Sequence, residues 1–147
     1  MVCNFMYNRY LIIYVKYFFY QFRYNDKIIF SMRTIFIGDV HGCLLELKDL
    51  VLKLALTPED RVILLWDLIN KWPYSAETVQ YIYESGFECV RGNHDEAYKQ
   101  FFKHSHLRHY FGPLKYETYK ETMSPEAHQW YMRTPIYIES DEWIAVH

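Results

Sequence analysis

The sequence lacks the long apolar run and the leader expected of a membrane or secreted protein. Residues 10–22 are its first apolar stretch, and they are shorter than the roughly 20 apolar residues of a membrane helix. Lys16 interrupts this stretch, and no cleavage site of small residues follows it. The three cysteines form neither a CxxC motif nor an even set. We therefore expect a reduced, cytoplasmic protein without membrane association.

The sequence also has little excess charge. Its formal net charge is −2, so it lacks the strongly positive balance of many nucleic-acid-binding proteins, and no nucleic-acid partner is expected. Hydrophobic residues make up 51% of the chain, which excludes a wholly disordered protein. A length of 147 residues suits one domain.

Alanine, glycine and proline are absent from residues 1–31, although aromatic residues are abundant there. This segment is net basic, whereas the rest of the chain is net acidic. The change predicts a boundary at Ser31–Met32, with residues 1–31 an N-terminal extension outside the fold and residues 32–147 the domain. We interpret the extension as translated upstream sequence; an aromatic and basic anchor at a membrane surface is the alternative.

From Met32 onward, strand-like and helix-like segments alternate, which predicts an α/β fold. Short apolar runs bounded by turn residues predict buried strands, and apolar residues at helical spacing predict helices. The expected strands cover residues 34–37, 61–65 and 87–91, with a hairpin at 137–146. The expected helices cover residues 44–54 and 75–84, and residues 95–134 are expected to be largely helical.

Polar clusters follow these strands: residues 38–42, 67–70, 92–95 and 146–147. Open α/β sheets place their ligand sites where the strands end, so these clusters are expected to meet. Carboxylate, amide and imidazole groups together suit a divalent ion such as Mn, Fe or Zn. Two such ions about 3.5–4 Å apart form the clamp used to hydrolyse phosphoesters.

The clusters read GDVHG, DLIN, GNHD and VH, in that order. In this order they resemble the signature of the calcineurin-like metallophosphoesterases. In finer detail, these motifs are similar to those of bacterial serine/threonine-phosphatase-like enzymes and of symmetrical dinucleoside tetraphosphatases. The resemblance implies a layered β-sandwich flanked by helices, of which this chain represents the N-terminal portion.

The resemblance also implies a role for each residue. Two divalent ions, most readily Mn²⁺, would be bound by five residues. Asp39 and His41 would hold the first ion, Asp67 would bridge both, and Asn93 and His147 would hold the second.

Three further residues would act on the substrate. His94 would protonate the leaving oxygen as the general acid. Lys71 stands where many relatives have an arginine that clamps phosphate, and Asn70 stands where protein phosphatases often have an aspartate that orients the catalytic histidine. The implied activity is metal-dependent hydrolysis of a phosphomonoester or phosphoanhydride, with a phosphorylated protein or a dinucleotide as substrate.

The chain departs from the family pattern at two glycines and at its end. Trp66 and Trp72 replace glycines beside the bridging aspartate and the basic residue, and nothing follows His147 to supply the family's further histidine ligand. Trp66 would be strained if its position requires a positive φ, and Trp72 would crowd the phosphate pocket. We therefore expect slow or no turnover from this chain. The alternative is an inactive, truncated remnant of such an enzyme.

Overall fold

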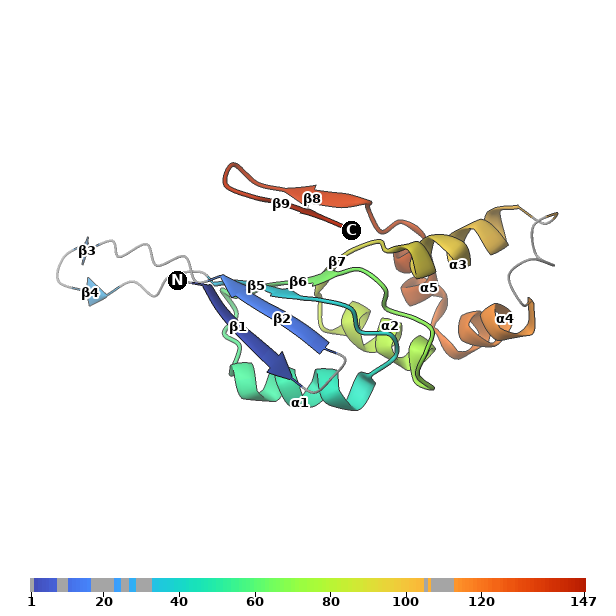
Figure 1. Cartoon of the computed structure of the whole chain (residues 1–147), viewed down its shortest axis with the longest axis horizontal. Coiled ribbons are helices and arrows are strands. Elements are labelled where there is room, and N and C mark those ends of the chain that lie inside the picture. Colours follow the sequence, from blue (N-terminus) through green and yellow to red (C-terminus); the bar gives the residue numbers. More distant parts are fainter. Residues whose placement is uncertain are drawn as a thin grey trace.

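The computed structural model describes residues 33–104, 106 and 115–147 with their side chains, together with the backbone of residues 113–114 and of four strands within residues 2–28. Its main sheet has the strand order β1-β2-β5-β6-β7 (Figure 1). These strands are β1 (Val2–Tyr7), β2 (Leu11–Lys16), β5 (Thr34–Ile37), β6 (Arg61–Leu65) and β7 (Glu88–Val90). The short strands β3 (Arg23–Tyr24) and β4 (Lys27–Ile28) pair with each other.

The strands β5, β6 and β7 are parallel and apolar on both faces. Ile35 and Ile37 pack with the helices on one face, whereas Phe36 belongs to a second buried cluster on the other. Because both faces are covered, the strands read as continuous apolar runs and do not alternate with polar residues. The three expected strands of the α/β fold are thus confirmed.

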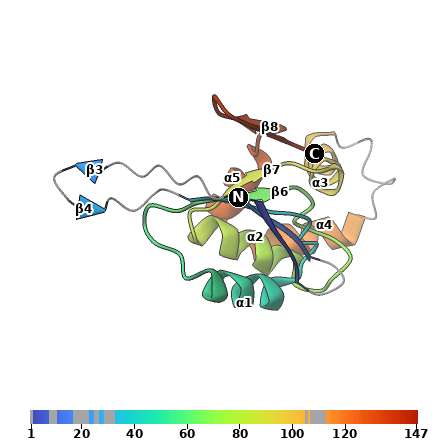
Figure 2. The same ribbon diagram turned by 60° about the vertical axis from the view of Figure 1, so that its left-hand side comes forward.

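Five helices lie in the described part of the chain: α1 (Leu44–Leu54), α2 (Ser75–Glu84), α3 (Asn93–Lys103), α4 (Pro113–Thr122) and α5 (Pro125–Met132). The first two agree with the sequence prediction, and the region expected to be largely helical divides into the last three. Figures 1 and 2 show α1 and α2 side by side along one face of the sheet. None of the helices among the described residues is long and apolar enough to cross a membrane.

The two serines expected to cap helices behave differently. Ser124 caps α5, because its hydroxyl accepts a hydrogen bond from the N–H of Ala127 at 3.1 Å. Ser75 does not cap α2; it is the first residue of that helix, and Tyr74 is the cap. The Ser75 hydroxyl instead accepts from the N–H of Asn70 at 2.9 Å, so it shapes the loop that precedes the helix.

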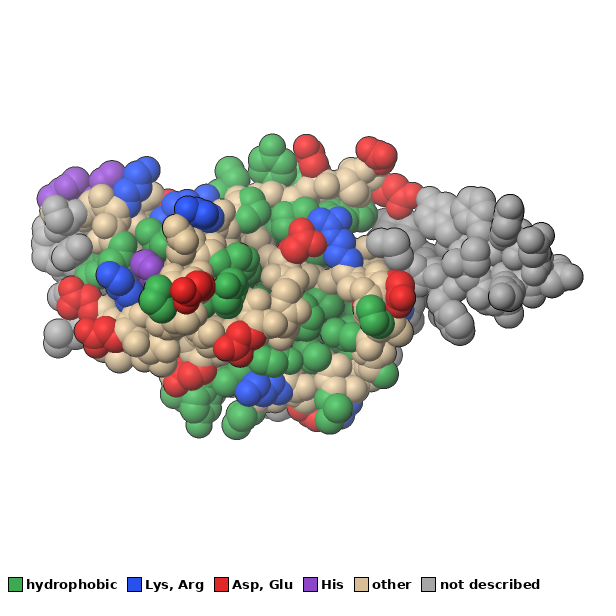
Figure 3. All heavy atoms as spheres, turned by 180° about the vertical axis from the view of Figure 1, so that it is seen from behind, with side chains coloured by type: hydrophobic (Ala, Val, Ile, Leu, Met, Phe, Trp, Pro, Cys, Tyr) green, Lys and Arg blue, Asp and Glu red, His purple; other side chains and the backbone are tan. Residues whose placement is uncertain are grey.

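The hairpin of β8 (Tyr137–Glu139) and β9 (Ile144–Val146) covers the other face of the sheet, as Figure 1 shows. Ala145 of the hairpin packs on Phe36, Leu65 and Val90. The outer side of the hairpin stays apolar, with Ile144 61% exposed. From behind, hydrophobic side chains and a group of acidic side chains lie along this upper edge of the molecule (Figure 3).

The N-terminal strands extend the sheet beyond the predicted boundary. β2 pairs antiparallel with β5, and β1 pairs with β2. This pairing gives β5 a second neighbour. The two clusters of described buried side chains lie within residues 35–145. The boundary at Ser31–Met32, with residues 1–31 outside the fold, stays a prediction.

Deletion of residues 1–31 tests this division. We expect the shortened chain to unfold cooperatively, because β5 keeps its pairing with β6 and the described cores lose no side chain. Circular dichroism and thermal unfolding of the full and shortened chains provide the comparison. Loss of cooperative unfolding in the shortened chain would show that β1 and β2 belong to the domain.

Arg33 fastens the start of β5 to the turn before β6. Its Nε donates to Asp60 Oδ1 at 2.7 Å, and its guanidinium also contacts the carbonyl oxygens of Leu54 and Ala55 at the end of α1. The hydrogen bonds from Arg33 lower the pKa of Asp60 to about 2. The Asp60 side chain is 2% exposed, which shields this ion pair from water.

The lowered pKa of Asp60 predicts an acid-dependent loss of stability. The unfolded carboxyl has its ordinary pKa of 3.8, so the pair contributes fully above about pH 4 and loses its contribution as the pH falls toward 2. Asp60→Asn should cost about 1 kcal/mol at pH 6 and less at pH 3, as measured by urea unfolding. The control is Asp49→Asn, which removes an exposed pair on α1. An equal cost for Asp60→Asn at both pH values would contradict the assignment.

Candidate metal centre

The site forms where β5, β6 and β7 end. The loop after β5 docks on the loop after β6 through backbone hydrogen bonds from the N–H of His41 to Asp67 O at 2.7 Å and from that of Gly42 to Leu68 O at 2.8 Å. The third loop, after β7, meets them through the N–H of His94, which donates to Asp67 Oδ1 at 3.0 Å. Three polar clusters that are distant in sequence are thus joined at Asp67.

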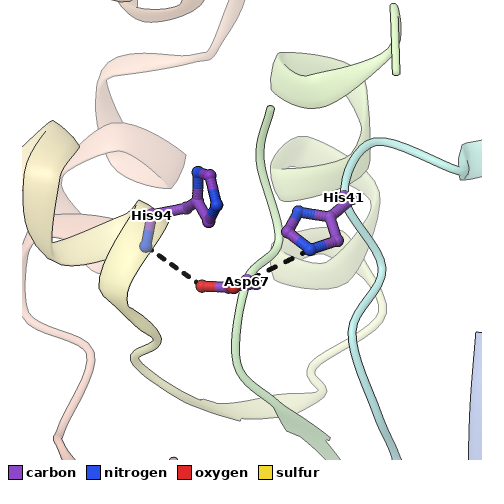
Figure 4. A group of neighbouring side chains, drawn as sticks. All are labelled: His41, Asp67 and His94. Atoms are coloured by element: carbon purple, nitrogen blue, oxygen red, sulfur yellow. Dashed lines mark hydrogen bonds and ion pairs between the residues drawn. The ribbon is translucent and has the colours of Figure 1, made fainter. Parts of the chain in front are cut away.

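Three side chains meet at this junction (Figure 4). His41, Asp67 and His94 offer ligand atoms that all lie within 4.8 Å of one another. His41 and Asp67 are buried, and the rings of His41 and His94 stand edge to face with centroids 5.1 Å apart. Imidazole nitrogen and carboxylate oxygen are the donors that a borderline divalent ion accepts.

The hydrogen bonds of His41 suit a metal ligand. Its Nδ1 lies 3.0 Å from the carbonyl oxygen of Ile69, which can only accept, so Nδ1 carries the proton and Nε2 presents its lone pair. The Lys71 ammonium lies 2.6 Å from this Nε2 as a donor. Carboxylate oxygens of Asp39 and Asp67 lie 3.3 and 3.7 Å from the same nitrogen. This nitrogen and the two carboxylates are suitable donors for a divalent ion, which would take the place beside Nε2 that the Lys71 ammonium occupies.

The backbone of Gly92, on the loop after β7, packs directly against Asp67. A Cβ on Gly92 would lie 2.1 Å from Asp67 Oδ1 and 2.6 Å from the Asp67 backbone nitrogen. No side chain fits at these distances, so the GNHD cluster needs glycine for close approach and not for a positive φ. This glycine allows β6 and β7 to place Asp67 and His94 in contact.

Asp95 links the loops that follow β6 and β7 through hydrogen bonds, a role that the sequence did not indicate. Its carboxylate accepts from the N–H of Leu68 at 3.0 Å and from that of Gly92 at 2.9 Å, and it also binds the Tyr131 hydroxyl. The side chain is buried, which raises its pKa, while these donors act in the opposite direction. An acid at the third position of a helix is a capping signal, and that signal could have identified it.

Asn70 holds the ring of His94. Its Nδ2 lies 2.9 Å from His94 Nδ1, and the backbone of Asn70 is buried against Ser75. When the amide nitrogen donates to Nδ1, the neutral imidazole carries its proton on Nε2. Burial lowers the pKa of His94, and the charge of Asp67 opposes this shift. The contact places Asn70 beside the ring of His94, and its orienting role stays a prediction.

The loop after β6 has a left-handed backbone at several residues that are not glycine. Trp66 has a φ of 89° and Asp67 a φ of 47°, followed by Asn70 at 71° and Lys71 at 66°. The backbone of Trp66 therefore has the positive φ that strains a residue other than glycine. Trp72 is not among the positive-φ residues, and as a residue it is 43% exposed to solvent.

Asn93 and His147 lie apart from the three-residue group. Both line a pocket of about 390 Å³, together with Gly92, Tyr137 and other residues of α3 and the hairpin. Both are exposed, and the ring of His147 contacts that of Trp66 with centroids 5.2 Å apart. Five residues are expected to bind metal. Asp39 and Asp67 lie beside Nε2 of His41, whereas Asn93 and His147 share a neighbouring pocket.

Gly92→Ala tests whether the close approach to Asp67 builds the site. We expect Mn²⁺ affinity to fall at least about tenfold, because the new methyl group must displace the Asp67 carboxylate. Isothermal titration calorimetry measures the affinity. Gly86→Ala is the matched control: its φ of 67° predicts a stability loss of about 1 kcal/mol, but its Cβ would meet nothing within 4 Å. Unchanged Mn²⁺ binding by a folded Gly92→Ala variant would refute this account.

Comparison with known proteins identifies relatives for most of the chain. Residues 32–142 match the family model of the calcineurin-like phosphoesterases. The symmetrical bis(5'-nucleosyl)-tetraphosphatase of Pseudomonas fluorescens strain SBW25 is 43% identical over 67 residues, which cover 44% of this chain and 24% of that protein. The same enzyme of Pseudomonas putida strain GB-1 is 42% identical over 67 residues, with 44% and 23% covered.

Solved structures share the fold. A crystal structure provisionally assigned as a diadenosine tetraphosphatase has a TM-score of 0.62 and 24% identity, over 78% of this chain and 49% of that one. A metallophosphoesterase from Sphaerobacter thermophilus has a TM-score of 0.56 and 21% identity, over 77% and 45% of the two chains. The chain thus spans about a quarter of the length of the two Pseudomonas enzymes and about half of the length of the two solved structures.

Proposed function

The chain belongs to the calcineurin-like phosphoesterase family, and from this membership we propose that it hydrolyses phosphoester or phosphoanhydride bonds with bound divalent ions. The observation that carries the proposal is the meeting of His41, Asp67 and His94 at the ends of three strands, with the lone pair of His41 Nε2 facing inward. Such a site has the donors for a metal and a separate histidine for proton transfer.

The family resemblance supplies the proposed metal ligands. Asp39, His41 and Asp67 would hold a first ion, and Asp67, Asn93 and His147 would hold a second. Divalent ions, with Mn²⁺ as the proposed metal, would neutralise phosphate charge and supply an activated water. The backbone N–H of His94 fixes Asp67 Oδ1, which leaves Oδ2 facing His41.

The chain's own side chains handle the proton and the phosphate charge. The Asn70 amide beside Nδ1 orients the ring of His94, which in its protonated form gives the Nε2 proton to the leaving oxygen as the phosphorus–oxygen bond breaks and becomes the neutral imidazole. The Lys71 ammonium stands beside His41 and attracts the phosphate oxygens as a point charge, without the two-pronged grip of an arginine.

We propose a dinucleoside polyphosphate as the substrate. Support comes from the symmetrical bis(5'-nucleosyl)-tetraphosphatases, which are 42–43% identical to this chain over 67 residues. A phosphorylated protein is the other substrate class that the motifs suggest. The buried free thiols of Cys43 and Cys89 support a cytoplasmic location as part of the proposal.

His94→Ala tests the proposed chemistry. The full chain should release nucleoside diphosphates from diadenosine tetraphosphate in the presence of Mn²⁺, and slowly, given the strain at Trp66. Loss of the general acid should reduce this rate about 10²-fold or more. His104→Ala, at the end of α3, is the control and should retain the rate. Chromatography of the products measures both variants.

The outcome also separates the substrate classes. A chain that dephosphorylates a phosphopeptide but leaves diadenosine tetraphosphate intact is a phosphoprotein phosphatase. Absence of Mn²⁺-dependent cleavage of both substrates and of p-nitrophenyl phosphate would refute the proposed activity and favour the inactive remnant. Equal rates for His94→Ala and the unmodified chain would remove His94 from the reaction.

A further inference from the structure

The loop between the site and α2 carries exposed aromatic rings. Its residues Lys71, Trp72, Pro73 and Tyr74 are all exposed, and Trp72 and Tyr74 are each 43% exposed. Large apolar side chains at a solvent face are common when they are scattered singly. Two within three residues, directly beside a buried polar site, point to a contact with a ligand.

Hydrogen bonds fix this loop against the site. The N–H of Trp72 donates to the carbonyl oxygen of His41 at 3.1 Å, and Ser75 Oγ donates to the carbonyl oxygen of Trp72 at 3.2 Å. A Cβ on Gly42 would lie 2.8 Å from the same Trp72 oxygen, which shows how closely the two loops pack. The backbone of Trp72 is therefore adjacent to a residue of the buried group, and its position is set before any ligand arrives.

A charged side chain and an aromatic side chain are neighbours in this loop, at Lys71 and Trp72. The Lys71 ammonium reaches inward to His41 Nε2, whereas the ring of the next residue, Trp72, reaches solvent. A nucleotide has the same sequence of properties, with charged phosphates at one end and a flat base at the other. Base–aromatic stacking tolerates any base, because every base has a π face.

We propose that Trp72 stacks on a nucleobase of the substrate while the attached phosphates lie at the metal centre. This proposal rests on the proposed function and makes the ligand a nucleoside 5'-polyphosphate. It also gives Trp72 a role opposite to the crowding expected from the sequence, in line with the 43% exposure of this residue. Trp72 then selects substrates that carry a base and contributes nothing to the cleavage of those without one.

Binding measurements on the full chain test the proposal. Isothermal titration calorimetry with Mn²⁺ present compares adenosine diphosphate with pyrophosphate, which shares the charged groups and lacks the nucleoside. We expect Trp72→Ala to weaken adenosine diphosphate about tenfold and to leave pyrophosphate within twofold. Trp72→Phe should retain most of the affinity, because a smaller ring still stacks. Leu52→Ala, which truncates a 78% exposed side chain on α1, should change neither ligand.

Kinetics with two substrates separate stacking from crowding. Stacking predicts that Trp72→Ala raises KM for diadenosine tetraphosphate and leaves p-nitrophenyl phosphate unchanged. Faster turnover of both substrates by Trp72→Ala would show crowding and overturn the proposal. So would an affinity for adenosine diphosphate that Trp72→Ala leaves within twofold, or a wild-type chain that prefers pyrophosphate.

The two proposals fail in different ways. A chain that binds adenosine diphosphate through Trp72 but hydrolyses no phosphate ester keeps the stacking site and loses the proposed activity. A chain that hydrolyses diadenosine tetraphosphate with an affinity for adenosine diphosphate independent of Trp72 keeps the activity and loses the stacking site.

Discussion

The hydrogen bond from the His94 backbone to the Asp67 carboxylate is the contact on which the site depends, because it joins the ends of β6 and β7. It forms only because Gly92 has no side chain, so that the third loop can approach Asp67. Once this contact is made, His41 is the remaining partner, and the loop after β5 brings it in through backbone bonds to Asp67. One carboxylate thereby gathers groups from three strands.

A second, buried carboxylate holds the framework around the first. Asp95 accepts hydrogen bonds from two loops and from Tyr131 of α5, so the helical layer is attached to the strand ends. Since a buried carboxylate is stable only when donors surround it, the packing of α5 and the shape of the site depend on each other. Both carboxylates are buried, but Asp95 binds backbone and tyrosine donors, whereas Asp67 lies beside two histidines.

The loop after β6 combines rigidity with strain. Its positive φ values at Trp66, Asp67, Asn70 and Lys71 are costly for residues other than glycine, and such strain is typically found at functional sites. Surrounding contacts maintain it: Asn70 is held by Ser75, and Lys71 by His41. The same loop turns Lys71 toward the site and Trp72 toward solvent, which is how a charged group and an aromatic ring come to border one site.

The sequence by itself determined the α/β class, the central strands and most helix boundaries, because these follow from local apolar periodicity and from caps such as Ser124. It also predicted which clusters carry the chemistry, since their residue types and order resemble those of the family to which the chain belongs. Only the tertiary structure decided that β2 pairs with β5, that Ser75 shapes a loop instead of capping α2, and that Asp95 ties the site together. It also decided that Asn93 and His147 lie in a pocket beside the three-residue group. These features depend on contacts between segments distant in the chain, and local sequence patterns do not specify such contacts.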